Sequence, residues 1–124
     1  MNVVDSSAWL EYFGDGPNAV EFATAIEALG ALVVPSLTLF EVFKRTHQIA
    51  DESRALDAVA LMMQGRIVDL TPPLAIAAAH TSPENGLAMA DSIILATARA
   101  EGAVLWTQDA HFEGIKGVEF RPKR

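Results

Sequence analysis

Four carboxylates stand at points of the sequence where they could act together on a phosphodiester bond. Asp5 ends the apolar run "NVVD", Glu41 lies in "PSLTLFEVFKR", Asp91 lies in "LAMADSIILATARAEG", and Asp109 follows "AVLWT". Carboxylates that gather at one place repel one another unless cations lie between them. Mg²⁺ and Mn²⁺ prefer oxygen ligands, can generate a hydroxide nucleophile and can stabilise a leaving oxygen. These residue types therefore indicate metal-dependent hydrolysis, provided that the fold brings all four together.

Asp91 has the most unusual local surroundings of the four. Ile94, Leu95 and Ala98 follow it by three, four and seven residues, so they share its face of a helix. A carboxylate on a face that becomes buried is costly unless something compensates its charge. A bound cation would do so, although a role as a helix cap or first-turn acid explains Asp91 equally well when it is taken alone.

The other three acids also have ordinary interpretations. Glu41 could pair with Lys44 or Arg45 on a solvated helix face. Asp5 could belong to a capping turn before two serines, and Asp109 could be a turn residue. Each interpretation is reasonable alone, and the stronger signal is the place that the four acids share in the expected fold.

Short apolar runs alternate with amphipathic segments along the whole chain. The runs predict strands at residues 2–5, 32–35, 66–70, 103–107 and 118–120. Helices are expected at residues 6–13, capped by Ser6 or Ser7; at 18–29, ended by Gly30; at 36–50, capped by Ser36; and at 51–65, 72–80 and 87–102, with a loop at 82–86.

This alternation predicts an α/β fold of three layers, with a mainly parallel central sheet of four to five strands and helices on both faces. The 124 residues are enough for a single domain, spanning 1–124. Ligands of such sheets bind at the carboxyl edge of the strands. All four acids are expected at that edge.

Composition narrows the classes of partner. The net charge of −7 argues against a broad basic face for nucleic acid, but it leaves room for a local basic rim or for bridging cations, and it suits a basic protein partner. The absence of cysteine excludes disulfides and thiolate metal sites. No signal peptide and no membrane span are evident, so a cytoplasmic protein is expected.

A few basic side chains are candidates for contacts with a phosphate-bearing substrate. Lys44, Arg45 and His111 are the candidates nearest to the acids, although solvated charges explain the first two equally well. Further along the chain, the same alternatives apply to Lys116, Arg121, Lys123 and Arg124. No pair among the three histidines has a metal-ligand spacing.

Three segments, in order, carry a family resemblance: "VVDSSAWLEYF", "PSLTLFEVFKR" and "MADSIILATARAEGAVLWTQDAHF". They resemble the PIN-domain ribonucleases, and more narrowly the VapC-type toxins of toxin–antitoxin pairs. The resemblance covers nearly the whole chain. Its most specific part is residues 90–112, in which an acid opens an Ala-rich helix and a strand leads into Thr-x-Asp and a Phe.

The resemblance implies a PIN-like fold and the endonucleolytic cleavage of RNA with Mg²⁺ or Mn²⁺. The acidic quartet of the family then corresponds to Asp5, Glu41, Asp91 and Asp109, all of which are present, and its small hydroxyl residues to Ser6 and Thr107. The resemblance also implies a homodimer and a cognate antitoxin whose tail occupies the active-site groove.

Two other classes of function remain open from the sequence. A phosphoacceptor receiver domain has a similar length, and "RIVDLTPP" places Asp69 after a strand. That class needs adjacent acids after the first strand and a Lys after the last, and neither is present. A catalytically inactive PIN-like scaffold that only binds a partner is the third possibility.

Overall fold

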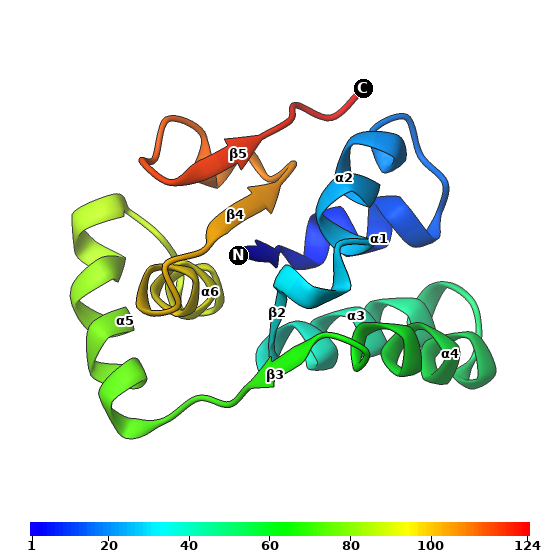
Figure 1. Ribbon diagram of the computed structural model, residues 1–124, viewed down its shortest axis with the longest axis horizontal. Coiled ribbons are helices and arrows are strands. Elements are labelled where there is room, and N and C mark those ends of the chain that lie inside the picture. Colours follow the sequence, from blue (N-terminus) through cyan, green and yellow to red (C-terminus); the bar gives the residue numbers. More distant parts are fainter.

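The computed structural model describes residues 1–124 and is built around a five-stranded sheet in which all paired strands run parallel. The strands stand in the order β3-β2-β1-β4-β5, so β1 is central (Figure 1). Their bounds are β1 Asn2–Val4, β2 Leu32–Pro35, β3 Arg66–Val68, β4 Val104–Thr107 and β5 Val118–Phe120. The parallel sheet expected from the sequence is confirmed.

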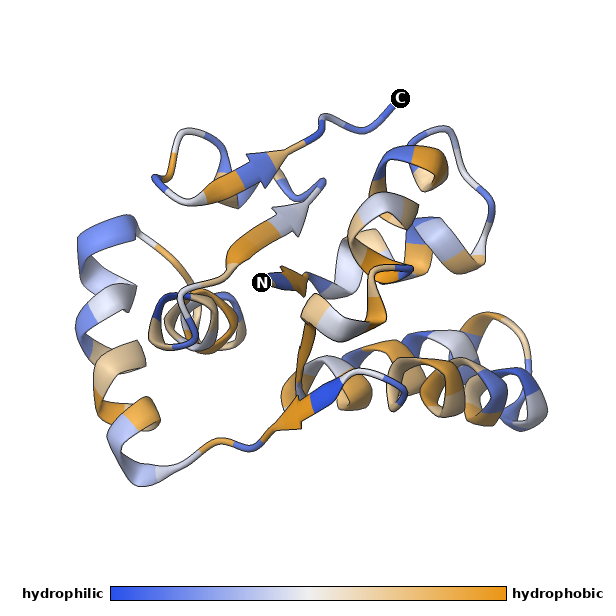
Figure 2. Ribbon diagram, viewed as in Figure 1, coloured by the Kyte–Doolittle hydropathy of each residue, from blue (hydrophilic) through white to orange (hydrophobic).

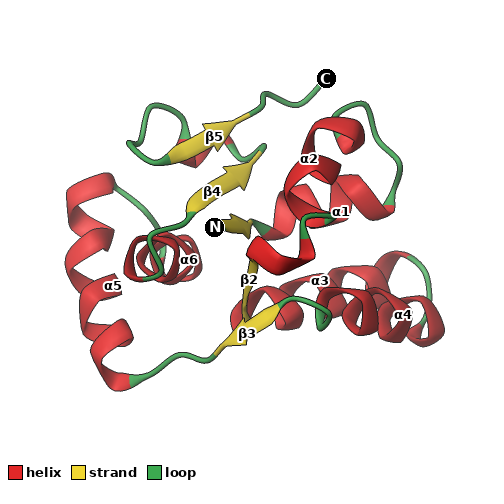
Figure 3. Ribbon diagram, viewed as in Figure 1, coloured by secondary structure: helices red, strands yellow, loops and turns green.

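Helices cover both faces of this sheet (Figures 1 and 3). Four helices lie on one side and two on the other, as the hydrophobic cores described below show. In chain order they are α1 Ser6–Phe13, α2 Ala19–Ile26, α3 Ser36–Ile49, α4 Glu52–Met62, α5 Pro72–Asn85 and α6 Met89–Ala100, with short 3₁₀ helices η1 Leu29–Ala31 and η2 Ala110–Phe112. The α/β class and its three layers are therefore confirmed.

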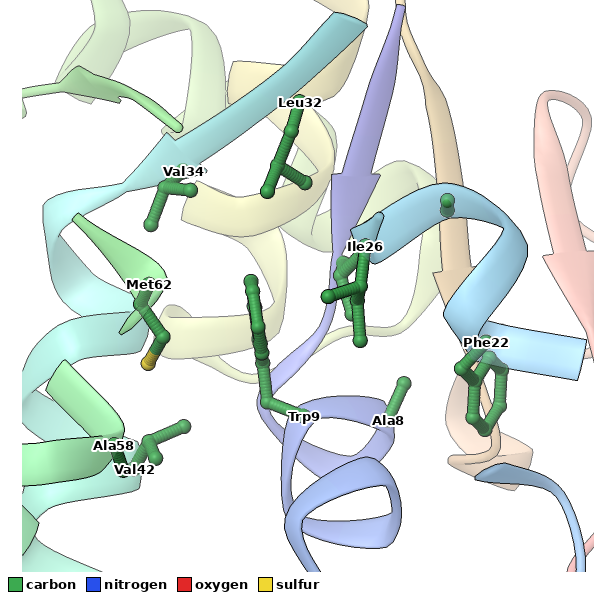
Figure 4. Packing of buried hydrophobic residues seen from close by; sticks show 11 residues of the cluster. Ala8, Trp9, Phe22, Ile26, Leu32, Val34, Val42, Ala58 and Met62 are labelled. Atoms are coloured by element: carbon green, nitrogen blue, oxygen red, sulfur yellow. The ribbon is translucent and has the colours of Figure 1, made fainter. Parts of the chain in front are cut away.

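Alternate residues of the strands enter two separate cores. Val4 packs with residues of α1 to α4 in the first core. Figure 4 shows the fully buried Trp9 of α1 in this core, between Ile26 of α2 and Met62 of α4. The neighbouring Val3 points to the other face and packs against α6. Burial on both faces requires strands that are apolar throughout, as the hydrophobic colouring of β2 illustrates (Figure 2).

The second core explains how α6 presents Asp91. Ile94, Leu95 and Ala98 are buried against Val3 and the β4 residue Leu105. Asp91 lies on the same face of α6, but in its first turn, one turn before the residues that pack into the core. The helix is thereby fixed with its acid at the carboxyl edge of the sheet.

The predicted loop at residues 82–86 is wrong. Helix α5 continues through Pro83 to Asn85 and ends at Gly86, which has a left-handed backbone with φ of 65°. Pro83 cannot donate to the carbonyl four residues before it, but a side chain adds a bond in the same last turn, where Asn85 Nδ2 donates to Thr81 O at 3.0 Å. The Ser82 hydroxyl likewise donates to Leu87 O, in the turn that follows the helix. Because the helix extends to Asn85, His80 lies inside it and not at its end.

Smaller corrections concern the other helix boundaries. Helix α2 ends at Ile26 and not at Leu29, because the chain leaves the helix there and passes through η1 into β2. Neither Ser6, Ser7 nor Ser36 caps a helix: Asp5 and Pro35 hold the N-cap positions of α1 and α3, without side-chain capping bonds. No helix is both long and apolar enough to cross a membrane.

Candidate active site

Asp5 is the buried centre of the acidic cluster. It is the first residue after β1, and only 3% of it is exposed. Its Oδ2 accepts hydrogen bonds from Ser7 Oγ at 2.7 Å and from Thr107 Oγ1 at 2.8 Å. Two hydroxyls from opposite ends of the chain thus hold one carboxylate oxygen in place.

Glu41 reaches the cluster from the second turn of α3. Ser6 Oγ donates to Glu41 Oε1 at 2.6 Å, which ties α3 to the start of α1. Glu41 is therefore not in the surface ion pair that its spacing to Lys44 and Arg45 allowed. Lys44 Nζ instead lies 5.8 Å from the centre of the Phe40 ring, and Arg45 lines a groove beside α1.

Asp91 and Asp109 face one another across the mouth of the site. Asp91 lies in the first turn of α6, whose N-cap Ala88 makes no side-chain capping bond. Asp109 comes two residues after β4, and its Oδ1 accepts from the His111 backbone N–H at 2.9 Å. The Nδ1 atom of His111 lies 3.3 Å from Asp109 Oδ1 and 3.5 Å from Asp91 Oδ2.

The electrostatics show that the four carboxylates act on one another. Burial raises the pKa of Asp5, and hydrogen bonds from Ser7 and Thr107 oppose this only in part. Burial also raises the pKa of Glu41, and the charges of Asp5, Asp91 and Asp109 raise it further. The pKa of Asp91 is raised by burial and then by Asp5 and Asp109. Three of the four acids are thus harder to ionise than an ordinary carboxyl group.

Such a cluster fits a hard divalent cation. Its donors are carboxylate oxygens from several elements, and ligand atoms of Asp91, Asp109 and His111 all lie within 4.8 Å of one another. Asp91 and Asp109 are partly exposed, with 17% and 32% of their side chains accessible, so an ion could enter from solvent. A divalent cation would also relieve the repulsion that raises these pKa values.

Ser7 is a site residue that sequence reasoning assigned to the wrong role. It was expected at most to cap α1, while Ser6 was paired with the first acid. In the structure Ser7 contacts Asp5, and also lies 3.2 Å from Thr107 Oγ1, whereas Ser6 contacts Glu41. Successive helical residues point about 100° apart, so the two serines serve different acids.

A buried amide pair supports the turn that carries Asp109. Asn18 is fully buried, and its Nδ2 donates to Gln108 Oε1 at 3.1 Å and to Pro122 O at 2.9 Å. The Gln108 backbone N–H in turn donates to Ser7 Oγ at 3.3 Å. The segment between β4 and η2 is therefore held from the α1–α2 side, although no local sequence signal marked Asn18 as more than the start of a helix.

Two of the basic residues near the C-terminus are already engaged. Arg121 Nε lies 3.5 Å from Glu21 Oε1, and Arg124 Nη2 lies 2.9 Å from Glu21 Oε2. The Arg121 guanidinium also sits 5.6 Å from the centre of the Trp106 ring. These contacts fasten the tail to α2 and β4, so Arg121 and Arg124 are not free phosphate contacts.

The two serines allow a matched test of the hydroxyl network. Ser7→Ala should lower the free energy of unfolding by about 1–3 kcal/mol, because it removes a hydrogen bond from a buried carboxylate. Ser6→Ala should cost less, because Glu41 is more exposed and water can replace the lost donor. Urea melts in chelator measure both values, and equal losses would contradict the assignment of Ser7 to a buried contact.

A pH series tests the raised pKa of Glu41. A carboxyl group with a higher pKa in the folded state binds more protons there than in the unfolded chain, so its contribution to stability falls as pH rises above about 4. In chelator, the unfolding free energy of wild type minus that of Glu41→Gln should therefore decrease from pH 4 to 7. The size of the decrease should match the titration of a single carboxyl group whose pKa is higher in the folded state. Glu84→Gln, an exposed acid on α5, is the control and should show a smaller change. A difference that increases with pH would contradict the expectation.

Comparisons with known proteins agree with this geometry. The family model described as "PIN domain" matches residues 3–118. A chain of a toxin–antitoxin complex from Klebsiella pneumoniae is 26% identical, with a TM-score of 0.77 and 96% of each chain covered. A comparison with curated proteins gave no match.

Two further solved structures share the fold at lower identity. VapC20 from Mycobacterium tuberculosis, described as a toxin that cleaves the sarcin–ricin loop, is 18% identical with a TM-score of 0.79, over 98% of this chain and 100% of that one. DNA-bound VapBC from Salmonella typhimurium is 18% identical with a TM-score of 0.74, over 98% and 96%. These two show similarity of fold alone. Because the family model spans nearly the whole chain and the acids gather at the carboxyl edge of its parallel sheet, the protein belongs to the PIN domain family.

Proposed function

We propose that this protein is an endoribonuclease that uses Mg²⁺ or Mn²⁺ to cleave RNA and that acts as the toxin of a type II toxin–antitoxin pair. One observation carries the proposal: four carboxylates from four separate segments of the chain lie at one edge of a PIN-domain sheet, where burial and neighbouring negative charges raise the pKa of Asp5, Glu41 and Asp91. A structural role would not require so much like charge in one place.

The residues of the chain divide into ligands and supports. Asp5, Glu41, Asp91 and Asp109 would hold the cation, and Ser7 and Thr107 keep Asp5 oriented while Ser6 orients Glu41. When bound, the cation supplies an activated water at neutral pH and stabilises charge on the phosphate. Lys44 and Arg45 lie one helical turn beyond Glu41 and are proposed to contact flanking phosphates.

Cleavage with and without chelator tests the proposed activity. The purified protein should cut single-stranded or looped RNA internally when Mg²⁺ or Mn²⁺ is present, and should stop when the ion is chelated. Cleavage that persists in chelator would contradict a cation-dependent mechanism. Binding of the cation without cleavage of any tested RNA would favour the inactive scaffold.

We also propose a cognate antitoxin as the partner of a homodimeric toxin in the cytoplasm. The likeness to a chain of a toxin–antitoxin complex supports this partner. A groove of about 570 Å³ starts one turn beyond Ser6 and Glu41 and runs between α1, α3 and α4, with Leu10, Phe13 and Arg45 in its lining. An antitoxin segment in this groove would lie beside the acids and hinder access of RNA.

The partner proposal has its own test. A small protein whose gene adjoins the gene of this chain should copurify with the chain, and it should inhibit cleavage when it is added at saturating concentration. Full cleavage in the saturated complex would contradict a segment that covers the site.

The receiver interpretation finds no support. Asp69 follows the edge strand β3, which is separated from the central β1 by β2, and its side chain is exposed and apart from the acidic cluster. The family match likewise points to a PIN domain and not to a receiver.

A further inference from the structure

His111 lies beside the acidic cluster in an arrangement that an ordinary surface histidine does not need. Its side chain is 74% exposed, yet its Nδ1 atom points toward two carboxylate oxygens, Asp109 Oδ1 at 3.3 Å and Asp91 Oδ2 at 3.5 Å. All three ligand atoms lie within 4.8 Å of one another. The imidazole therefore lies at the exposed side of the site, next to both Asp91 and Asp109.

A positive charge stabilises the convergence of these three atoms, whether it is a proton on the imidazole or a bound cation. Carboxylate oxygens and an unprotonated Nδ1 all present lone pairs, so they repel one another when nothing lies between them. A proton on Nδ1 can serve both oxygens only through a bifurcated hydrogen bond, whereas a cation can bind all three atoms directly. Two ligands of one ion with bonds of about 2.0–2.1 Å lie at most about 4.2 Å apart, and both His111 separations are shorter than that.

The backbone holds His111 in this place. Asp109 Oδ1 accepts from the His111 N–H at 2.9 Å, and the Asp109 N–H donates to Thr107 Oγ1 at 3.0 Å. The next residue, Phe112, is fully buried in the core beneath α6. The η2 turn is thus anchored at both ends, and the imidazole can reach the site without rearrangement of the chain.

We propose that Nδ1 of His111 is a ligand of the cation and makes the site selective for Mn²⁺ over Mg²⁺. This inference rests on the proposed metal-dependent function and specifies its ion. Both ions prefer oxygen ligands, but Mn²⁺, as a transition metal, accepts an imidazole nitrogen more readily than Mg²⁺ does. The four carboxylates alone would give a site with little reason to prefer Mn²⁺, and the nitrogen supplies that preference.

The test is the binding of each ion to the full chain without RNA. In wild type, pulsed electron paramagnetic resonance of bound Mn²⁺ should show coupling to a ¹⁴N nucleus, and this coupling should vanish in His111→Ala and in His111→Gln. Calorimetry should show that each variant binds Mn²⁺ about 10-fold more weakly or worse, since even the loss of a partner behind a ligand costs 10–100-fold. Affinity for Mg²⁺ should change by no more than about 2-fold, because Mg²⁺ gains little from a nitrogen ligand.

His80→Ala is the matched control, because His80 is exposed on α5 and lies outside the cluster. It should keep the ¹⁴N coupling and both affinities. Melts in chelator verify that the His111 variants are folded.

The outcomes separate this inference from the proposed function. Mn²⁺ that binds wild type without ¹⁴N coupling, or coupling that survives in both His111 variants, would overturn the role of His111 and leave the four-carboxylate site intact. Equal weakening of Mg²⁺ and Mn²⁺ would overturn the selectivity. Failure of wild type to bind either ion would overturn both this inference and the metal-dependent function.

Discussion

Asp5→Asn is expected to lower RNA cleavage by about 10²–10³-fold, the scale on which removal of one preorganised electrostatic group can act. Asparagine keeps the size of the side chain and can still accept hydrogen bonds from Ser7 and Thr107, but it removes the negative charge at the centre of the cluster. Single-turnover cleavage with saturating Mn²⁺ measures the loss. Asp5 is the most buried of the four acids, so a water molecule cannot enter and take the place of its carboxylate as a ligand.

The stability of the same variant distinguishes lost chemistry from lost fold. Burial raises the pKa of Asp5, so a neutral isostere should leave the unfolding free energy in chelator unchanged or higher. Asp69→Asn, at an exposed acid after β3, is the control and should cleave as wild type does. A folded Asp5→Asn protein that cleaves RNA at the wild-type rate would contradict the proposed site.

The elements with strong local signals could be predicted from the sequence. Strands β1, β2 and β4 are short apolar runs that identify them directly, and β1 and β2 are buried on both faces. In β4 only Leu105 and Thr107 are buried, and Val104 is exposed. The end of α5 could not be predicted in the same way. Its Ser-Pro-Glu-Asn segment has turn-forming residues, but the side chains of Ser82 and Asn85 bond backbone carbonyls around the end of the helix.

The meeting of the four acids was predictable because topology alone brings them together. Parallel strands end at one edge, so acids that follow β1 and β4 must approach one another once the strands pair. Of the residues that support these acids, Ser6 and Thr107 were expected from the family resemblance, although Ser6 contacts Glu41 and not the first acid. The contacts of Ser7 and of Asn18 were not predictable, because they depend on the rotation of a helix or on distant residues. Asn18 and Gln108 are 90 residues apart, and nothing local relates them.

His111 shows the same limit at the proposed metal site. No pair among the three histidines has a metal-ligand spacing, so the sequence marked His111 only as a candidate substrate contact near the acids. The partners of His111 are carboxylates instead, one two residues before it and the other twenty residues before it on α6. Spacing rules identify ligands that share one element, and this arrangement spans two.

The second large effect is expected at Asp91, where metal binding and fold stability act in opposite directions. Asp91→Ala should abolish cleavage and also abolish the stabilisation by Mn²⁺, which is about 2.7 kcal/mol when the free ion is about 100 times its dissociation constant. In chelator the variant should be as stable as wild type or more so, because burial and the charges of Asp5 and Asp109 raise the pKa of Asp91. Urea melts of both proteins, each in chelator and in Mn²⁺, give the four values needed.

A structural role for Asp91 gives the opposite pattern. If the carboxylate served mainly as a helix-capping acid, its removal would cost roughly 0.5–2 kcal/mol in chelator, and Mn²⁺ would still stabilise the variant as it does wild type. The geometry already disfavours this pattern, because the first turn of α6 has no side-chain capping bond, while Asp91 Oδ2 instead faces His111 Nδ1. A variant that is less stable in chelator but is stabilised normally by Mn²⁺ would therefore remove Asp91 from the site. The cation would then have to be held without the acid that α6 presents beside His111.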